Sequence, residues 1–520
     1  CYIALRGYDN EYFKKERINL INRLLSFAPN NSTLFYRRAQ AELSTSVENA
    51  RNDLKTALEN YPYNYDALAL QRTIDSKPNV FDLFKNPDYD KLFSEAKTND
   101  NTDIEILIDE DQMVVYDGGA TELRKVRMIK SINEKGVDRL KEFNLPYYGN
   151  QDFSIEKAEV FKVNGNKLKG EINDNKVVFT NLEKGDAVLL IYKYKDYPII
   201  GLNNHNIHMF PFNTYTYNHK RKITILAHPA YKFTYKSRGF DTKPVVTKVD
   251  DFDSYVWEQE NVERIEDEPS MPDYWDVGKY ITISSIPDWK YINNWYQVLS
   301  NTSTENTKIL DRTIKKIFPS GPSSNKLENA KQIYEYIVKN VRYSSVWFRN
   351  SNLVPQEVSK TLSSRLGDCK DVSLAFKTLA EKVGIKSNLI LVNTKDNGTM
   401  QYDLPSIEFN HCMVKMNIDN TDYFLELTSD MNGFKTVGNK VLNACYLEIG
   451  ENAANSIQRI NPNSRVLNST IRKTVMNFES EKLIVSKEVL YLGDMASYKK
   501  SKFRNIEFKD QEKHVMGSLP

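Results

Sequence analysis

The spacing of apolar residues changes several times along this chain, and each spacing permits a different kind of structure. Apolar residues that recur every three or four positions form one face of a helix, whereas alternation fits a strand with one buried side. A chain of 520 residues is also too long for a single hydrophobic core. We therefore expect an α+β multidomain protein with three or four domains, divided where the apolar spacing changes.

Residues 1–95 have helical spacing and contain a weak internal repeat. The segment "LLSFAPNNSTLFYRRA" resembles "ALENYPYNYDALALQR", with Pro29 and Pro62, and Asn31 and Asn64, each 33 positions apart. A period of this length with a proline turn between helices resembles tetratricopeptide-type repeats. Two copies are fewer than such a solenoid usually needs, so we expect a truncated start; two unrelated helical hairpins are the alternative.

Residues 101–298 consist of short alternating or apolar segments, such as "TDIEILID", "DAVLLIYKYKD" and "KRKITILAHP", separated by the turn sequences "DGG", "NGN" and "NDN". This pattern predicts a β-sandwich domain. Residues 300–450 mix helical and strand spacing, which predicts a mixed domain. Residues 455–520 return to alternation, as in "EKLIVSKEVLYLG", and we expect the start of a second β domain there.

Composition and segment length argue against several classes of protein. The 71 Lys and Arg residues balance 69 Asp and Glu residues, so charge gives no reason to expect a nucleic-acid partner. The most apolar short segment, "AVLLIYKY", has the length of a strand, whereas a bilayer-spanning helix needs roughly 20 apolar residues. No transmembrane segment is expected. The four cysteines lack the spacing of a disulfide framework.

The chain begins "CYIALRG", without an initiator methionine or a signal-peptide pattern. We expect a fragment or a processed form. The alternative is that Cys1 is the lipidated first residue of a mature lipoprotein.

The segment "SSRLGDCKDVSLAFKTLAEKVGI" places a cysteine at the start of a predicted helix. Apolar residues from Val372 to Val383 recur at three- and four-residue steps, and Gly384 provides the stop. Asp368 is the candidate N-cap, so Cys369 falls in the first turn. There the unpaired backbone N–H groups and the positive end of the helix dipole favour a thiolate.

A thiolate at this position needs a nearby cation, because Asp368 and Asp371 oppose its negative charge. A histidine is the best partner, since imidazole can take the thiol proton and keep it. Of the six histidines, His411 is the most suggestively placed, in "EFNHCMVKMNIDNTDYFLELTSD".

The sequence around His411 predicts a β-hairpin. A loop at 419–420 would place His411 opposite Thr428, with Glu426 diagonal on the same face and Cys412 on the other. Thiol, imidazole and carboxylate would then come from three elements. The imidazole takes the thiol proton, while the carboxylate holds the ring tautomer and stabilises its positive charge.

Structural explanations stand beside these functional ones. A cysteine at a helix start is more often structural, and polar residues on a strand are commonly just solvated. A zinc site from Cys369, His411 and Cys412 would need the last two to point the same way, which strand alternation forbids. We expect Cys412 and Cys445 to be small buried apolar residues. Sheet packing explains aromatic runs such as "WKYINNWY" more simply than a sugar-binding groove.

Four segments, "IYEYIVKNVRYSS", "LVPQEVSKTLSSRLGDCKDVSLAFKTLAEKVGI", "FNHCMVKM" and "YFLELTS", together resemble the bacterial transglutaminase-like domain over residues 300–450. The resemblance implies a papain-type Cys, His, Asp order, with Cys369 as nucleophile, His411 as general base and Glu426 where the family usually has aspartate. Upstream, "DAVLLIYKYKD" and "MPDYWDVGKYITISSIPDWKYINNWYQVL" resemble the β-rich domain of unknown function that precedes such domains in many bacterial proteins.

This resemblance implies cysteine-dependent amide-bond chemistry, by hydrolysis or by transfer, on protein or peptide substrates. The chemistry needs no metal or other cofactor. An oxyanion donor is required; the backbone N–H of Cys369 is one candidate, and Trp347 and Gln356 are side-chain candidates for which packing is the alternative. The implied setting is the bacterial periplasm or cell envelope.

One departure from the family pattern leaves rival functions open. Glutamate at position 426 has one methylene more than aspartate, so either its side chain folds back or its strand shifts. The runner-up function is therefore an inactive papain-like scaffold in an assembly protein, whose N-terminal helical repeats bind a protein partner. A glycan-binding envelope protein is the third candidate.

Overall fold

The computed structural model describes residues 11–98, 101–147, 149–202, 204–301, 307–344, 353–399, 402–461, 468–504 and 506–516. Their contacts form two compact units, Cys1–Met271 with Gly278–Ser285, and Pro272–Val277 with Ile286–Pro520. Among the described residues, no helix has both the length and the apolar character needed to cross a membrane.

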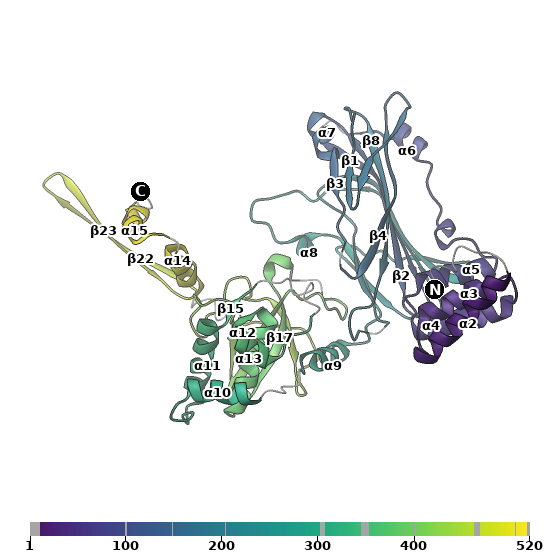
Figure 1. Ribbon diagram of the computed structural model, residues 1–520. Helices are drawn as coiled ribbons and strands as arrows, with labels where there is room; N and C mark the ends of the chain where they lie inside the picture. The colour runs from purple at the N-terminus through teal and green to yellow at the C-terminus, as the bar shows by residue number, and fades with distance from the viewer. Residues whose placement is uncertain are drawn as a thin grey trace. The chain divides into compact units, whose positions relative to one another are not determined.

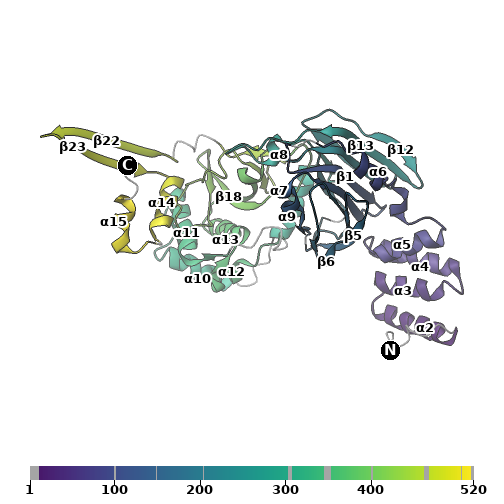
Figure 2. The same cartoon turned by 90° about the horizontal axis from the view of Figure 1, so that it is seen from above.

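The first unit begins with helices that stack one after another (Figure 2). They are α2 (Glu11–Phe27), α3 (Ser32–Glu42), α4 (Val47–Asn60) and α5 (Tyr65–Ile74), followed by η1 (Val80–Leu83) and α6 (Tyr89–Glu95). Asn31 and Asn64, the pair 33 positions apart, each cap a helix start with the side chain. Their core consists mainly of alanines, which allow close helix approach, and includes one leucine: Ala39, Ala50, Leu54, Ala57 and Ala67.

An eight-stranded sheet follows, in the order β12-β13-β10-β1-β2-β8-β4-β5. Its strands are β1 (Ile104–Val115), β2 (Thr121–Ser131), β4 (Gln151–Phe161), β5 (Lys167–Lys169), β8 (Ala187–Asp196), β10 (Asn218–Ala227), β12 (Val245–Val249) and β13 (Phe252–Val262). Neighbours are antiparallel except β1 and β10, which run parallel. The segments quoted as candidate strands lie in β1, β8 and β10, which confirms their β assignment.

Two three-stranded sheets complete the β part of this unit. One contains β3 (Glu142–Asn144), β7 (Lys176–Val178) and β6 (Glu171–Asn173), with α7 (Glu134–Leu140) nearby in sequence; the other contains β11 (Thr234–Arg238), β14 (Tyr280–Ser284) and β9 (Ile207–Pro211). Each shares an apolar cluster with a different part of the large sheet. Asp109 and Asp111 of β1 form ion pairs with neighbouring strands. Lys125 lies 2.6 Å from Asp109 and 2.8 Å from Asp111, and buried Arg221 also pairs with Asp111.

The second unit contains a five-stranded sheet in the order β19-β18-β17-β20-β21. The strands are β17 (Ser387–Asn393), β18 (His411–Ile418), β19 (Thr421–Leu425), β20 (Cys445–Ile449) and β21 (Gln458–Arg459). The helices are α8 (Tyr274–Val277), α9 (Trp289–Ser300), α10 (Thr307–Ile317), α11 (Lys326–Asn340), α12 (Val358–Ser364) and α13 (Cys369–Lys382), with the short strands β15 (Arg342–Tyr343) and β16 (Leu366–Gly367) and the 3-10 turn η2 (Lys395–Asn397). Helices α11, α12 and α13 lie together beside β17 (Figure 1).

The boundary between the two units lies before α9, at 285–286. The sequence places the end of the β-rich segment at residue 298, near the end of α9. Asn293 of α9 donates to the carbonyl of Gly450 after β20 and accepts from its N–H, both at 2.9 Å. These bonds attach α9 to the five-stranded sheet.

The last part of the chain contains one hairpin and two helices. Strands β22 (Thr470–Glu479) and β23 (Lys482–Tyr491) pair along their whole length, followed by α14 (Asp494–Arg504) and α15 (Phe508–Met516). The predicted β structure is therefore present in 470–491, but 494–504 and 508–516 are helical. The sequence "DMASYKKSKFR" lacks alternation and is rich in residues that favour helices, so extending the β pattern to residue 520 was wrong.

Candidate active site

Cys369 is the first residue of α13, as the sequence predicts. Its N-cap is Asp368, whose side chain accepts from the backbone N–H groups of Lys370 and Asp371. The Asp371 side chain in turn accepts from the Asp368 N–H at 3.0 Å, and the two contacts together form a capping box. Gly367 permits this close approach, because a Cβ there would lie 2.9 Å from the Asp371 Cβ. The Cys369 side chain is buried, with 3% exposed.

Neighbouring groups moderate the acidic character of this helix start. The ammonium of buried Lys370 forms an ion pair with Asp368. Burial, which is the largest effect, raises the pKa of Asp371, and the Asp368 charge adds to the rise. The Lys370 ammonium reduces the repulsion that the Asp368 carboxylate exerts on a negative sulfur at Cys369.

Gln356 and Trp347 were the predicted side-chain oxyanion donors. The Gln356 side-chain amide donates to the Leu366 carbonyl at 2.8 Å and to Asp371 Oδ2 at 3.2 Å, and its backbone N–H donates to Asp371 Oδ1 at 2.9 Å. Gln356 thus supports the capping box in this structure. Trp347 lies outside the described residues, so its role stays a prediction.

His411 opens β18 in the predicted hairpin. The loop residues Asp419 and Asn420 both have positive φ, as a two-residue hairpin turn requires, and Ile418 pairs with Thr421. On its other side β18 pairs with β17, where Val392 lies opposite His411. The register that the sequence predicts is confirmed for the paired residues, from Val414 with Leu425 to Ile418 with Thr421. The predicted placement of His411 opposite Thr428 falls beyond the end of β19 at Leu425.

Glu426 follows the last residue of β19, and its side chain folds back. Its Oε2 lies 2.8 Å from His411 Nε2. Its Oε1 accepts from the Thr428 N–H at 3.0 Å and from the Thr428 hydroxyl at 2.6 Å. Of the two ways in which a longer acid was expected to fit, the structure uses folding back, and Thr428 holds that conformation.

His411 and Glu426 each shift the pKa of the other toward its charged form. Burial lowers the pKa of His411, but the Glu426 charge and hydrogen bonds with Cys369 and Glu426 outweigh it and raise this pKa well above its usual value. Burial raises the pKa of Glu426, yet its contacts with His411 and Thr428 hold it below its usual value. Both shifts favour the charged forms, an imidazolium beside a carboxylate. Since Glu426 occupies Nε2, the ring nitrogen left for the Cys369 thiol is Nδ1.

Two buried tyrosines at this site were not singled out from the sequence. Tyr296 of α9 has its pKa raised well above the usual value, first by burial and then by the charges of Cys412 and Cys369. Tyr334 of α11 donates its hydroxyl to the Glu426 carbonyl at 3.0 Å. Tyr334 lies in a helical run whose spacing predicts packing and gives no sign of a hydroxyl contact. Tyr296 lies in the run "WKYINNWY", for which we expected sheet packing; that was wrong, because the run forms helix α9.

The two other described cysteines are buried, as predicted, with 1% of Cys412 and 2% of Cys445 exposed. Burial raises the pKa of both thiols. The Cys412 carbonyl accepts from the Ser373 hydroxyl at 3.2 Å, which ties β18 to α13 and so helps to hold His411 beside Cys369. Within the described parts of the chain, no group of three or more His, Cys, Asp or Glu residues is arranged to hold a metal ion.

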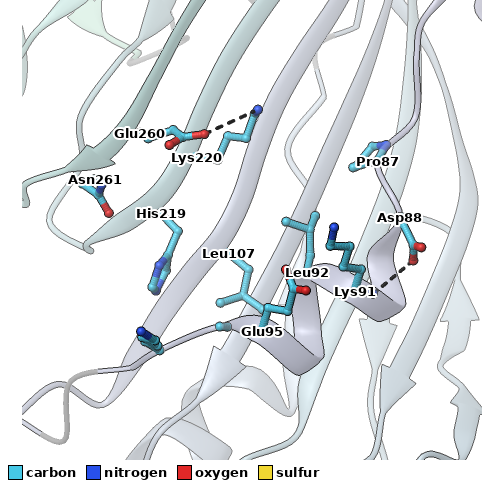
Figure 3. A pocket seen from close by; sticks show the side chains of 12 residues that line it. Pro87, Asp88, Lys91, Leu92, Glu95, Leu107, His219, Lys220, Glu260 and Asn261 are labelled. Carbon is cyan, nitrogen blue, oxygen red and sulfur yellow. Dashed lines mark hydrogen bonds and ion pairs between the residues drawn. The ribbon is translucent and has the colours of Figure 1, made fainter.

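The first unit has a cavity of about 420 Å³ beside α6 (Figure 3). None of Cys369, His411 and Glu426 lines it. Three basic and three acidic side chains line it: Lys91, Lys97 and Lys220, and Asp88, Glu95 and Glu260. Their balance gives no preference for a ligand of either sign.

Comparison with known proteins assigns the region that contains this site. Residues 314–430, which include Cys369, His411 and Glu426, match the model of the Transglutaminase-like superfamily. They form a transglutaminase-like domain. No curated protein matches the chain.

Solved structures add a likeness of fold. The structure described as a "putative protease" from Parabacteroides distasonis aligns with a TM-score of 0.54 and 15% identity, over 69% of this chain and 72% of that chain. A "putative cysteine protease" from Cytophaga hutchinsonii aligns with a TM-score of 0.22 and 11% identity, over 55% of this chain and 89% of that chain. At its identity, the first alignment shows the fold alone.

Proposed function

We propose that the transglutaminase-like domain carries out cysteine-dependent chemistry on the amide bonds of protein or peptide substrates. The observation that carries this proposal is a single imidazole, His411, which lies 2.8 Å from the Glu426 carboxylate and whose pKa is raised by both Glu426 and the nearby Cys369 thiol. A raised pKa at His411 favours the imidazolium, and an imidazolium stabilises a neighbouring thiolate. The family match supports papain-like cysteine chemistry as the general class.

In the proposed reaction, the Cys369 thiolate attacks the carbonyl carbon of an amide, and the electron pair of the C=O bond moves to oxygen. The backbone N–H of Cys369, at the start of α13, is the donor we assign to that oxygen. When the carbonyl re-forms, the C–N bond breaks and the His411 imidazolium gives its proton to the leaving amine. A thioester at Cys369 remains. Water as acceptor then releases an acid, whereas an amine acceptor forms a new amide.

Alkylation of Cys369 by iodoacetamide tests this assignment. The rate is followed by mass spectrometry of the Cys369 peptide between about pH 5 and pH 9, in wild type and in the His411→Ala variant. We expect the wild type to react at low pH, where an ordinary thiol is protonated, and the variant to lose that reactivity. Cys412 and Cys445 serve as internal references, since burial raises the pKa of both thiols. Identical profiles in the two proteins would end the enzyme proposal.

Two further assays separate hydrolysis from transfer. Release of peptide fragments or ammonia reports hydrolysis, and incorporation of a fluorescent primary amine into a glutamine-containing protein reports transfer. Both are run with Cys369→Ala as the matched control, because activity that survives this change does not come from the proposed thioester.

The second candidate is a scaffold without catalysis. The observation that favours it is the burial of Cys369, of which 3% is exposed. A scaffold would bind its partner equally well with Cys369→Ala, and the envelope variant of this idea would show saturable polysaccharide binding that the same change leaves intact. Neither result is expected from an enzyme whose substrate contacts the sulfur.

We also propose that α2 to α5 act as tetratricopeptide-like repeats that bind a protein partner, in a bacterial periplasm or cell envelope. The equivalent N-caps Asn31 and Asn64 and the alanine-rich core between the helices support the repeat. Pull-down of cell-envelope proteins with the full chain tests it, using substitutions on the exposed face of these helices as controls. Recovery of the same proteins by those variants would contradict the proposal.

A further inference from the structure

The segment 426–432, which follows β19, carries the acid of the proposed site. Its two ends are joined by one side chain: the single O–H of Tyr334 is shared between the Glu426 carbonyl at 3.0 Å and the Asn432 carbonyl at 3.3 Å. Tyr334 belongs to α11 and is 1% exposed. Its ring contacts Phe434 edge-on, with centroids 5.5 Å apart. A buried side chain of the domain therefore holds the two ends of segment 426–432 together.

The path of this segment sets the direction of the Glu426 carboxylate. Thr428 lies within it, and both its N–H and its hydroxyl bind Glu426 Oε1. If the backbone between 426 and 428 shifts, the carboxylate turns with Thr428, because the carboxylate and Thr428 are joined by two hydrogen bonds. Oε2 then leaves His411 Nε2. The position of the backbone is what the Tyr334 hydroxyl fixes.

We propose that Tyr334 is a positioning residue of the active site, whose hydroxyl holds segment 426–432 so that the folded-back Glu426 reaches His411. This inference rests on the proposed function. It explains how the domain accommodates a glutamate: the longer side chain is held by Thr428, and the loop that presents Thr428 is held by Tyr334. The bond from Tyr334 to the Glu426 carbonyl is buried and therefore well suited to this, since water does not compete for that acceptor.

A second contact on the same segment provides a matched control. Arg504 of α14 donates to the Asp430 carboxylate at 2.9 and 3.2 Å, but the two side chains are 57% and 42% exposed. Exposed ion pairs contribute little because water and salt screen them. Arg504→Ala removes a contact from the outside of the segment and should leave Glu426 in place. Tyr336→Phe removes a hydroxyl from the same helix, at a half-buried position on another face.

The test compares Tyr334→Phe with wild type, Glu426→Gln, Arg504→Ala and Tyr336→Phe. For each protein, the rate of Cys369 alkylation is measured against pH, and a thermal melt records folding. Without a well-placed Glu426, the His411 imidazolium is less stable, so the acid limb of the profile moves to higher pH. We expect Tyr334→Phe to move it in the same direction as Glu426→Gln and to slow alkylation at about pH 6 by roughly tenfold. Arg504→Ala and Tyr336→Phe should retain the wild-type profile.

Three results would overturn the inference. The first is a folded Tyr334→Phe protein with the wild-type profile. The second is a shift of equal size in Arg504→Ala. The third is a Tyr334→Phe protein that no longer folds, since the hydroxyl would then support the domain as a whole. Loss of the proposed function is recognised separately, because His411→Ala would then alkylate like wild type.

Discussion

Shortening Glu426 to aspartate is expected to weaken the site, although aspartate is the usual acid of the transglutaminase-like pattern. The Glu426 carboxylate now satisfies two partners at once, His411 at 2.8 Å through Oε2 and Thr428 through Oε1. Removing one methylene withdraws the carboxylate by about 1.5 Å, the length of a C–C bond. An aspartate held by Thr428 then no longer reaches His411.

The size of the effect follows from the distance. With an effective dielectric constant of about 20, two unit charges attract by about 6 kcal/mol at the observed 2.8 Å and by about 4 kcal/mol at about 4.3 Å. The loss of about 2 kcal/mol corresponds to roughly a thirtyfold change in the ratio of imidazolium to imidazole at a fixed pH. If the aspartate instead stays with His411, it forfeits the hydrogen bonds from Thr428, at a similar cost of about 1.5–3 kcal/mol.

The assay is the pH profile of Cys369 alkylation in wild type, Glu426→Asp and Glu426→Gln, with urea unfolding as the measure of stability. Glu426→Asp should lie between wild type and Glu426→Gln in both measurements. A Glu426→Asp protein that equals or surpasses wild type would refute the reasoning, because the folded-back conformation would then have no consequence for His411.

Three other predictions concern the same elements. The stability that protonated His411 contributes is fully present below its unfolded pKa of about 6.5 and is lost as pH rises through its raised folded pKa. The stability that ionised Glu426 contributes is present above its unfolded pKa of about 4.5 and is lost as pH falls through its depressed folded pKa. The gap in urea-unfolding free energy between wild type and Glu426→Gln should therefore be largest between about pH 4.5 and about pH 6.5, and shrink as pH rises toward the raised pKa of His411 or falls toward the depressed pKa of Glu426; a pH-independent gap contradicts the ion pair. Thr428→Val, which removes the 2.6 Å hydroxyl bond but keeps the backbone bond, should lower that free energy by about 1.5–3 kcal/mol and slow alkylation, and equal values would show that the backbone bond suffices. Asp368→Ala removes both the N-cap and the carboxylate that pairs with buried Lys370, so chemical denaturation should show a loss of about 4 kcal/mol or more, whereas Asp368→Asn, which keeps a capping oxygen, should lose about 1 kcal/mol less than Asp368→Ala.

Local signals in the sequence were sufficient for much of the transglutaminase-like domain. The N-cap Asp368 and the apolar stripe after it specify where α13 begins, because a capping side chain acts within three residues of itself. The loop at 419–420 fixes the register of β18 against β19, since hairpin geometry depends on the turn alone. Both features bring Cys369 and His411 to defined places without any knowledge of distant contacts.

Other features depend on partners far away in the sequence. The residue types of the acidic run in β1 predict a solvent-exposed strand. Asp109 and Asp111 are nevertheless buried, because Lys125 and Arg221 on neighbouring strands pair with them. The Glu426 carbonyl accepts from the hydroxyl of a tyrosine 92 positions earlier. No periodicity reveals such a contact, because it is made by one hydroxyl group on an otherwise ordinary helix.

The charge state of His411 tests the central claim most directly. Histidine labelled with ¹⁵N is introduced into the full chain, and the His411 signals, assigned through His411→Ala, are followed with pH in wild type and in Glu426→Gln. The account predicts that both ring nitrogens of wild-type His411 stay protonated at neutral pH, where a free imidazole is mostly neutral, and that Glu426→Gln lowers the pH of titration. A wild-type His411 that titrates near its ordinary value of about 6.5, unaffected by residue 426, would contradict the ion pair on which the proposed chemistry depends.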